Sequence, residues 1–218
     1  MQSILASYRK LRYTTLKRQC YSRKAHKEDG TVSQVCIFLA EGFEEIEALT
    51  VVDILRRAGI GIQTVSITGE KQVVSSHKVP VMADALFEDI DFAGVDMIVL
   101  PGGMPGTKNL EAHEGLMAQV DAFYEQGKWL SAICAAPSIY GHKGMLKGKK
   151  ACCFPEFESH LEGAEVVRDP VCVSGKIITS RGMGTAILFG LEICAQLAGR
   201  QKADEIATKI IYTPAQQE

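Results

Sequence analysis

The sequence predicts an α/β fold with a mainly parallel sheet and helices on both of its faces. From Gln34 onward, short apolar runs without polar alternation take turns with longer amphipathic segments, which is the rhythm of β-α-β units. Continuous apolar runs are typical of strands buried on both faces, as parallel strands are. Acidic residues at the start and a glycine at the end delimit the clearest helix. These observations favour a three-layer sandwich.

The elements follow one another without an internal repeat. The helix over residues 44–59 carries acids in its first turn, Arg56 and Arg57 in its last, and Gly59 at its end. Ser174-Gly175 marks the turn of a hairpin whose arms are residues 166–173 and 176–180. The remaining strands are expected at 34–40, 60–68, 95–103, 129–134 and 149–154, and the remaining helices at 116–128, 185–199 and 201–211.

The composition is that of one globular domain, expected over residues 33–218. The apolar fraction of 46% argues against disorder of the whole chain. A formal net charge of -2 gives no reason to expect nucleic acid as a partner. No apolar run approaches the roughly 20 residues that a membrane helix needs. Seven cysteines without a CxxC pair suit a reduced intracellular compartment.

Residues 1–32 differ in composition from the rest of the chain. This segment carries eight Lys and Arg residues and no acid before Glu28. It resembles an organelle transit peptide, most often mitochondrial, and a basic disordered tail or a non-native leader is the alternative. The extension is therefore excluded from the fold, and the protein is expected in the cytoplasm or the mitochondria.

The stretch "LSAICAAPSIYG" makes Cys134 the first candidate for chemistry. Small residues flank the cysteine, as a tight strand-to-helix turn requires, and Pro137 follows where a first helical turn tolerates it. A thiol at a helix N-terminus faces the positive end of the helix dipole, which would lower its pKa. The alternative is an inert buried cysteine, the common fate of this residue.

Glu47 is the second candidate. It shares a stripe of its helix with Val51, Ile54 and Ala58. A carboxyl group on an apolar stripe is either partnered or raised in pKa by desolvation, although an acid near a helix start can also simply complement the dipole. The same helix has a second apolar face, through Ile46, Leu49 and Val52, which predicts deep burial or a second subunit.

Three strands are expected to end in unusual loops, "AEGFEE", "LPGGMPG" and "ICAAPS". In parallel sheets, ligands bind at the carboxyl ends of the strands, so the three loops would form one crevice. Gly102 and Gly103 allow backbone geometry that exposes N–H groups, and with the amide of Ala135 they would form an oxyanion hole for an adduct of Cys134. A glycine pair alone is weak evidence, since turns use glycine routinely.

The chain resembles the ThiJ/PfpI superfamily and, within it, the Parkinsonism-associated deglycase group. The stretches that carry the resemblance are "LAEGFEEIEALTVVDILRRAGI", "VDMIVLPGGMPGTKNL", "SAICAAP" and "ITSRGMGTAILFGLEI", in the order of the family. The resemblance implies a flavodoxin-like sandwich and a homodimer built on the first helix. It implies that Cys134 is the reactive cysteine, Glu47 its protonated partner, and Gly103 and the backbone after Cys134 the oxyanion donors.

The same resemblance implies chemistry on a small reactive aldehyde without any cofactor or metal. Family members are described as glyoxalases that convert methylglyoxal to lactate, as deglycases of early glycation adducts, as chaperones and as sensors of oxidative stress. Two readings follow for this chain: a cysteine-dependent glyoxalase or deglycase, or a redox sensor and chaperone in which Cys134 is oxidised to sulfinate.

One departure from the family pattern bears on mechanism. Many relatives place a histidine near the cysteine, and the matching position here is Phe154. A Cys-His dyad for peptide hydrolysis therefore lacks its base. His142 and His160 are near in sequence, but nothing in the sequence places them in the crevice. His77 stands where some relatives carry an anion-binding arginine near the dimer interface.

Overall fold

The computed structural model describes residues 34–213, and the predicted basic leader lies outside the described residues. A seven-stranded sheet forms the middle layer, in the order β10-β11-β7-β6-β1-β2-β5. All of its strand pairs are parallel except β10–β11. The strands are β1 (Gln34–Leu39), β2 (Gly61–Ser66), β5 (Ala85–Leu86), β6 (Met97–Leu100), β7 (Trp129–Ile133), β10 (Val171–Ser174) and β11 (Ile177–Ser180).

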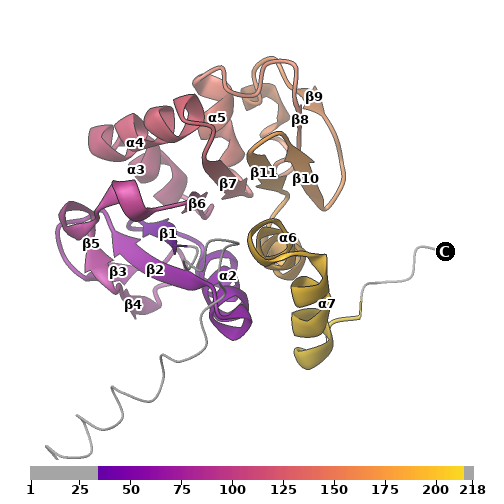
Figure 1. Cartoon of the computed structure of the whole chain (residues 1–218). Helices are drawn as coiled ribbons and strands as arrows, with labels where there is room; N and C mark the ends of the chain where they lie inside the picture. The colour runs from indigo at the N-terminus through magenta and orange to yellow at the C-terminus, as the bar shows by residue number, and fades with distance from the viewer. Residues whose placement is uncertain (1–33, 214–218) are drawn as a thin grey trace, which may run out of the picture.

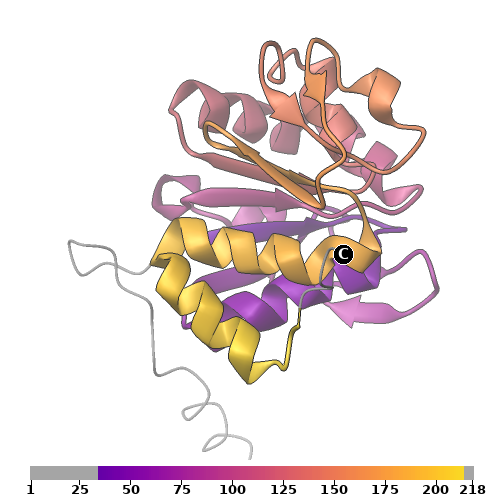
Figure 2. The same ribbon diagram turned by 90° about the vertical axis from the view of Figure 1, so that its right-hand side faces the viewer.

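Helices cover both faces of this sheet (Figures 1 and 2). One face carries α2 (Glu45–Ala58), α6 (Ala186–Ala198) and α7 (Arg200–Lys209), and the other carries α3 (Gly106–Ala112), α4 (Glu114–Glu125) and α5 (Pro137–His142). Each face has its own apolar core. The predicted three-layer α/β class is therefore confirmed. Within residues 34–213, no helix is both long and apolar enough to cross a membrane.

Small elements account for the differences from the sequence-based expectation. The hairpin of β3 (Gln72–Val74) and β4 (Pro80–Met82) and the pair of β8 (Lys150–Ala151) with β9 (Glu165–Val166) lie outside the main sheet. The predicted arm 166–173 is wrong in its first half, because Val166 pairs with β8 and β10 begins only at Val171. Pro170 has no N–H to donate to a ladder, which separates the two strands.

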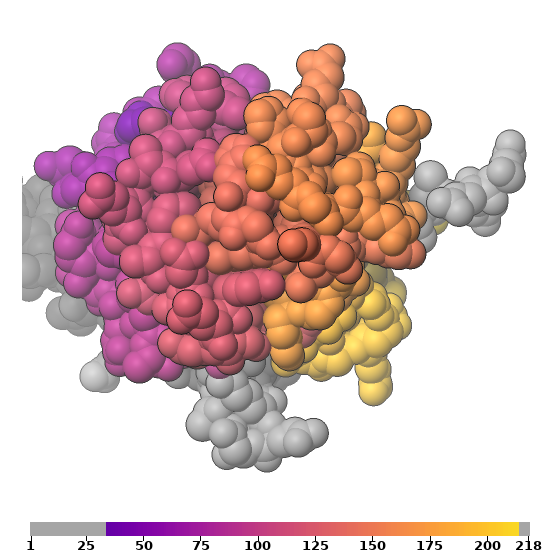
Figure 3. All heavy atoms as spheres, turned by 90° about the horizontal axis from the view of Figure 1, so that it is seen from above, coloured from indigo at the N-terminus to yellow at the C-terminus, as the bar shows by residue number. Residues whose placement is uncertain are grey.

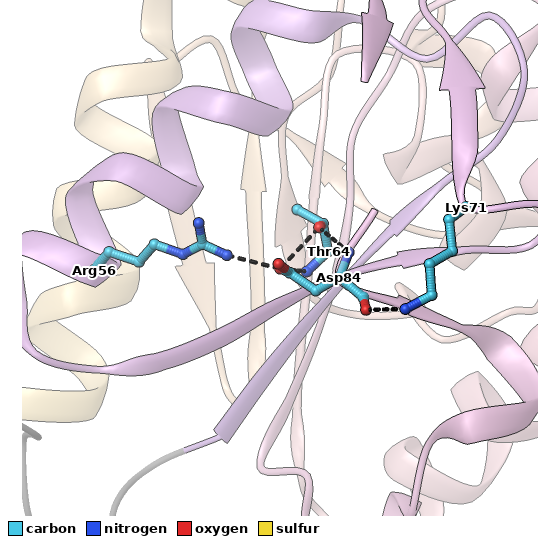
Figure 4. A network of polar contacts seen from close by, with 4 residues as sticks. All are labelled: Arg56, Thr64, Lys71 and Asp84. Atoms are coloured by element: carbon cyan, nitrogen blue, oxygen red, sulfur yellow. Dashed lines mark hydrogen bonds and ion pairs between the residues drawn. The ribbon is translucent and has the colours of Figure 1, made fainter. Parts of the chain in front are cut away.

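Asp84 precedes the short edge strand β5 and extends its contacts with β2 through hydrogen bonds to Thr64 (Figure 4). Its amide donates to the carbonyl of Thr64 at 2.9 Å, and its carboxylate accepts from the amide and the hydroxyl of Thr64, both at 2.9 Å. Arg56 of α2 donates to the same carboxylate at 2.7 Å, and Lys71 donates to the Asp84 carbonyl at 2.7 Å. Asp84 thus ties the sheet edge to α2.

Replacing Asp84 with Ala is expected to destabilise the fold by about 1–3 kcal/mol, because the buried groups of Thr64 lose their acceptor. Asp53→Ala is the matched control, since Asp53 pairs with Arg57 at 2.6 Å on an exposed surface and should change stability by less than about 1 kcal/mol. Urea unfolding measures both variants. Equal losses for Asp84→Ala and Asp53→Ala would contradict this account.

Candidate active site

The topology brings the three predicted loops to one edge of the sheet. β7, β6 and β1 are neighbours and run parallel, so their carboxyl ends lie side by side. Cys134 follows β7, Gly102 and Gly103 follow β6, and Glu47 lies in the first turn of the helix that follows β1. Residues that lie far apart in the sequence are thereby placed within contact distance.

Cys134 sits on a sharp turn between β7 and α5. Its φ of 65° lies in the left-handed region, which non-glycine residues rarely adopt. Backbone bonds fix the turn on both sides: the Cys134 amide donates to the carbonyl of Ser180 at 3.0 Å, and its carbonyl accepts from the amide of Phe154 at 2.8 Å. Pro137 then begins α5, as the sequence predicted. The surrounding structure thus imposes the strained geometry.

Glu47 is a buried carboxyl group with 1% of its surface exposed. Its amide donates to the carboxylate of Glu44, the N-cap of α2, at 2.6 Å. Its own Oε2 accepts from the amide of Gly102 at 2.9 Å. Burial raises the pKa of Glu47 to about 7, against the opposing effects of the Gly102 bond and of a hydrogen bond with Cys134. The carboxyl group is therefore protonated over much of the range below neutral pH.

Gly102 lies between the two candidate side chains. A Cβ atom at this position would lie 2.6 Å from the Cβ of Cys134 and 2.8 Å from Oε2 of Glu47. Any other residue would push the thiol and the carboxyl group apart. The amide of Gly102, which the sequence placed in an oxyanion hole, is instead engaged by Glu47. Its role in this geometry is to orient the carboxyl group.

The other two expected donors face the sulfur. The amides of Ala135 and Gly103 both lower the pKa of the Cys134 thiol through backbone hydrogen bonds. Gly103 adopts a φ of 92°, and a Cβ atom there would lie 2.5 Å from the Glu44 nitrogen, so this position requires glycine. Two backbone amides that converge on a nucleophile are the geometry with which enzymes bind a developing oxyanion.

The acidity of Cys134 differs from the expectation of a lowered pKa. Burial, reinforced by the charge and the hydrogen bond of Glu47, raises the pKa of the thiol to about 12. The expected helix dipole is weak because α5 has six residues. The thiol of the resting site is therefore protonated, and Glu47 is the group that titrates near neutral pH.

The rim of the site contains two residues that the sequence did not single out, Gly182 and Ser180, and one that it did, Phe154. A Cβ atom at Gly182 would lie 3.3 Å from the ring of Phe154 and 4.0 Å from Oε1 of Glu47. Ser180 contributes only its carbonyl. Such backbone roles leave no mark on residue type. Phe154, 45% exposed, lies at the edge of the site.

The histidines named from the sequence bond to other partners. His142 bonds to Glu111 at 2.6 Å and to His160 at 3.0 Å. His77 bonds to Glu45 at 3.2 Å. Glu44, Glu45 and His77 together offer possible metal-ligand atoms that lie within 4.8 Å of one another. That trio does not include Cys134.

Comparison with known proteins places the chain among relatives. Residues 33–196 match the DJ-1/PfpI family. Protein DJ-1 homolog B of Arabidopsis thaliana is 36% identical over 91% of this chain and 46% of its own length. The chain spans about half the length of the two Arabidopsis relatives that it matches. The "Glutathione-independent glyoxalase DJ-1" of Schizosaccharomyces pombe is 33% identical over 79% of this chain and 95% of its own.

Solved structures agree with the family match. The structure described as "Toxoplasma gondii DJ-1, oxidized" has a TM-score of 0.80 and 35% identity, and it covers 84% of this chain and 100% of its own. Sequence and fold thus agree over nearly the whole of the described domain. The chain belongs to the DJ-1/PfpI family.

Proposed function

We propose that the chain is a cofactor-independent glyoxalase that converts methylglyoxal, free or released from early glycation adducts, to lactate. One arrangement supports this proposal most. The half-buried thiol of Cys134 shares a hydrogen bond with the buried carboxyl group of Glu47, whose pKa is raised, and two backbone amides hydrogen-bond to the sulfur. The relative from Schizosaccharomyces pombe is named a glutathione-independent glyoxalase. That relative is 33% identical in sequence to this chain, which supports the proposal.

The first step joins the Cys134 sulfur to the aldehyde carbon of methylglyoxal. Glu47 in its charged form accepts the thiol proton as the S–C bond forms. The aldehyde oxygen becomes an oxyanion held by the amides of Ala135 and Gly103. Glu47 then gives the proton to that oxygen, which forms a hemithioacetal and returns Glu47 to its charged form. The carbonyl carbon of the substrate is unchanged at this stage.

The remaining steps move protons and add water, with no net oxidation. Glu47 removes the C–H proton of the hemithioacetal carbon, and water gives a proton to the neighbouring carbonyl oxygen, which gives an enediol. Glu47 then gives that proton to the second carbon while the hydroxyl group on the first carbon loses its proton to water, which yields the lactoyl thioester of Cys134. Water attacks that thioester, the S–C bond breaks, and the thiol leaves with a proton as lactate is released.

Replacing Cys134 with Ser is expected to lower the rate of lactate formation from methylglyoxal by roughly 10³-fold or more. Glu47→Gln keeps an acceptor for the Gly102 amide but cannot carry a proton, so a loss of roughly 10²- to 10⁴-fold is expected. Cys172→Ser, on edge strand β10, is the matched control and should retain activity. Lactate production at the wild-type rate in Cys134→Ser would overturn the mechanism.

The pH profile should report the Cys134–Glu47 pair. Below pH 7 both Cys134 and Glu47 are protonated, so the pair has no base to activate the thiol. Loss of the first proton, near the Glu47 pKa of about 7, creates the reactive form. kcat/KM should therefore rise with pH through about 7 and then stay level, since the second proton is held to about 12. Steady-state rates from pH 5 to 9.5 test this. A profile without an inflection between pH 6 and 8 contradicts it.

A redox sensor is the second candidate, and the same amides support it. Peroxide would add two oxygens to the Cys134 sulfur stepwise, each step reducing one peroxide molecule to water, and the sulfinate formed would accept from Ala135 and Gly103. The methylglyoxal assay separates the two functions. Negligible turnover by the wild type, together with selective oxidation of Cys134 seen by mass spectrometry, favours the sensor.

We also propose that the protein is a homodimer through α2. Ile46 and Leu49 are 47% and 37% exposed, whereas Val52, from the same predicted face, is buried. The two exposed residues border a hollow of about 540 Å³ that also includes Ile187, Ile210 and Ile211. An apolar surface of this kind beside a helix is typical of an interface.

Ile46→Glu is expected to shift the dimer toward monomer, because two carboxylates would enter an apolar contact without partners. Analytical ultracentrifugation at micromolar concentration measures the shift. Val166→Glu, at a residue of similar exposure on β9, is the control and should leave the dimer intact. A monomeric wild type, or an unchanged dimer in Ile46→Glu, would rule out this interface.

A further inference from the structure

A chain of three titratable side chains lies on the α3–α5 side of the molecule, apart from the candidate active site. His142 is the last residue of α5, His160 ends a short 3-10 helix over Glu158–His160, and Glu111 lies in the last turn of α3. The Glu111 carboxylate and Nδ1 of His142 are 2.6 Å apart, and Nε2 of His142 and Nδ1 of His160 are 3.0 Å apart. Figure 3 shows the surface over which residues 140–165 gather.

With one proton on each imidazole, the hydrogen bonds assign both tautomers. A carboxylate only accepts, so Nδ1 of His142 carries the proton that it donates to Glu111. Nε2 of His142 then has a free lone pair, and Nδ1–H of His160 donates to it. The result is a nitrogen lone pair on His142 that a carboxylate orients from behind.

Backbone contact holds the two histidines together. Gly141 precedes His142, and a Cβ atom at Gly141 would lie 1.9 Å from the carbonyl oxygen of His160 and 2.9 Å from the nitrogen of Glu162. The absence of a side chain therefore lets the end of α5 touch the segment that carries His160. The His160 ring also packs on Phe157, with centroids 5.6 Å apart. Both imidazoles are placed by the fold rather than by chance contact of long side chains.

We propose that His142 and His160 form a binding site for a divalent transition-metal ion of the Ni²⁺, Cu²⁺ and Zn²⁺ class, with Glu111 orienting His142. Two imidazole nitrogens bound to one such ion lie roughly 2.9–3.4 Å apart, given metal–nitrogen distances of about 2.0–2.1 Å, and the observed separation is 3.0 Å. A carboxylate behind a ligating histidine is the usual outer partner in metal sites. Water completes the coordination.

Binding requires one proton shift and small rotations of the rings. His160 moves its proton from Nδ1 to Nε2, so that both facing nitrogens present lone pairs and no proton is released overall. The rings, now edge to face at 79°, turn so that the two lone pairs meet at the ion. The side chains of His142 and Glu111 are 33% and 36% exposed, so an ion can reach them from solvent.

The electrostatics of the helices favour this cluster over the trio of Glu44, Glu45 and His77. Glu111 and His142 lie at the C-terminal ends of the short helices α3 and α5, which do not repel a cation. Glu44 and Glu45 lie at the N-terminal end of α2, where the helix repels one, and the Glu44 carboxylate already accepts from the Glu47 amide. Imidazole is also the softer ligand, which Ni²⁺ and Cu²⁺ prefer to carboxylate.

Titration of the full chain with Ni²⁺, followed by calorimetry, tests the proposal. The titration uses a Cys134→Ser, His26→Asn background. The first change removes the thiol of the candidate active site, the second removes a histidine that lies outside the described residues, and both groups would compete for the metal. One saturating ion per chain is expected. His142→Asn and His160→Asn should each weaken binding at least tenfold, and Glu111→Gln should weaken it about 10- to 100-fold. His77→Asn is the control and should change the affinity less than twofold.

Circular dichroism of the metal-free variants checks that each is folded. In the otherwise unchanged protein, imidazole NMR signals give a second measurement: Ni²⁺ should broaden those of His142 and His160 before those of His77. Loss of binding in His77→Asn with retention in His142→Asn would place the metal at the other cluster and overturn the proposal. Absence of saturable binding, or an unchanged affinity in Glu111→Gln, would overturn it as well.

Discussion

The hydrogen bond from the Gly102 amide to the Glu47 carboxyl group is the contact on which the site depends. It joins the loop after β6 to the first turn of α2, and the Glu44 amide returns a bond to the Gly102 carbonyl at 2.9 Å. Because Gly102 has no side chain, the same backbone also passes against Cys134. Two hydrogen bonds thus join the ends of β6 and β1, and the end of β7 packs against the same glycine.

Burying that carboxyl group makes stability depend on pH. The folded state holds the Glu47 proton to about pH 7, against an ordinary value of 4.5. Below 4.5 the group is neutral in both states and has no effect. As pH rises from 4.5 toward 7, only the unfolded chain ionises freely, so the free energy of unfolding falls by roughly 3 kcal/mol in total, at 1.36 kcal/mol per pKa unit. The site is kept at the expense of stability, as functional sites often are.

Much of this arrangement was predictable from residue patterns. Apolar runs and helix boundaries gave the layers, the loops at strand ends gave Cys134 and the glycine pair, and the apolar stripe of its helix gave Glu47. The contribution of Ser180 escaped prediction, since any residue has a carbonyl group. So did the β8–β9 pairing, because two-residue strands carry no periodicity. The prediction of a lowered pKa for Cys134 was wrong in direction, because burial and Glu47 raise the pKa more than a six-residue helix lowers it. The effects of burial and of Glu47 cannot be compared without the fold.

Phe154 marks a limit on what the chain can do with its thiol. The aromatic ring lies at the rim of the site, at the position where the family resemblance implied a histidine, so in the proposed mechanism proton transfer at the sulfur falls to Glu47.

The cysteines of the described domain raise a question of chemical selectivity. Burial raises the pKa of the Cys36 thiol to about 12 and that of Cys194 to about 11, so neither differs from Cys134 by being much less acidic. What differs is access: within residues 34–213 every other cysteine is buried, and Cys134 alone reaches solvent in part. An electrophile would therefore discriminate among these thiols by whether it can arrive, and its bulk would matter more than its reactivity.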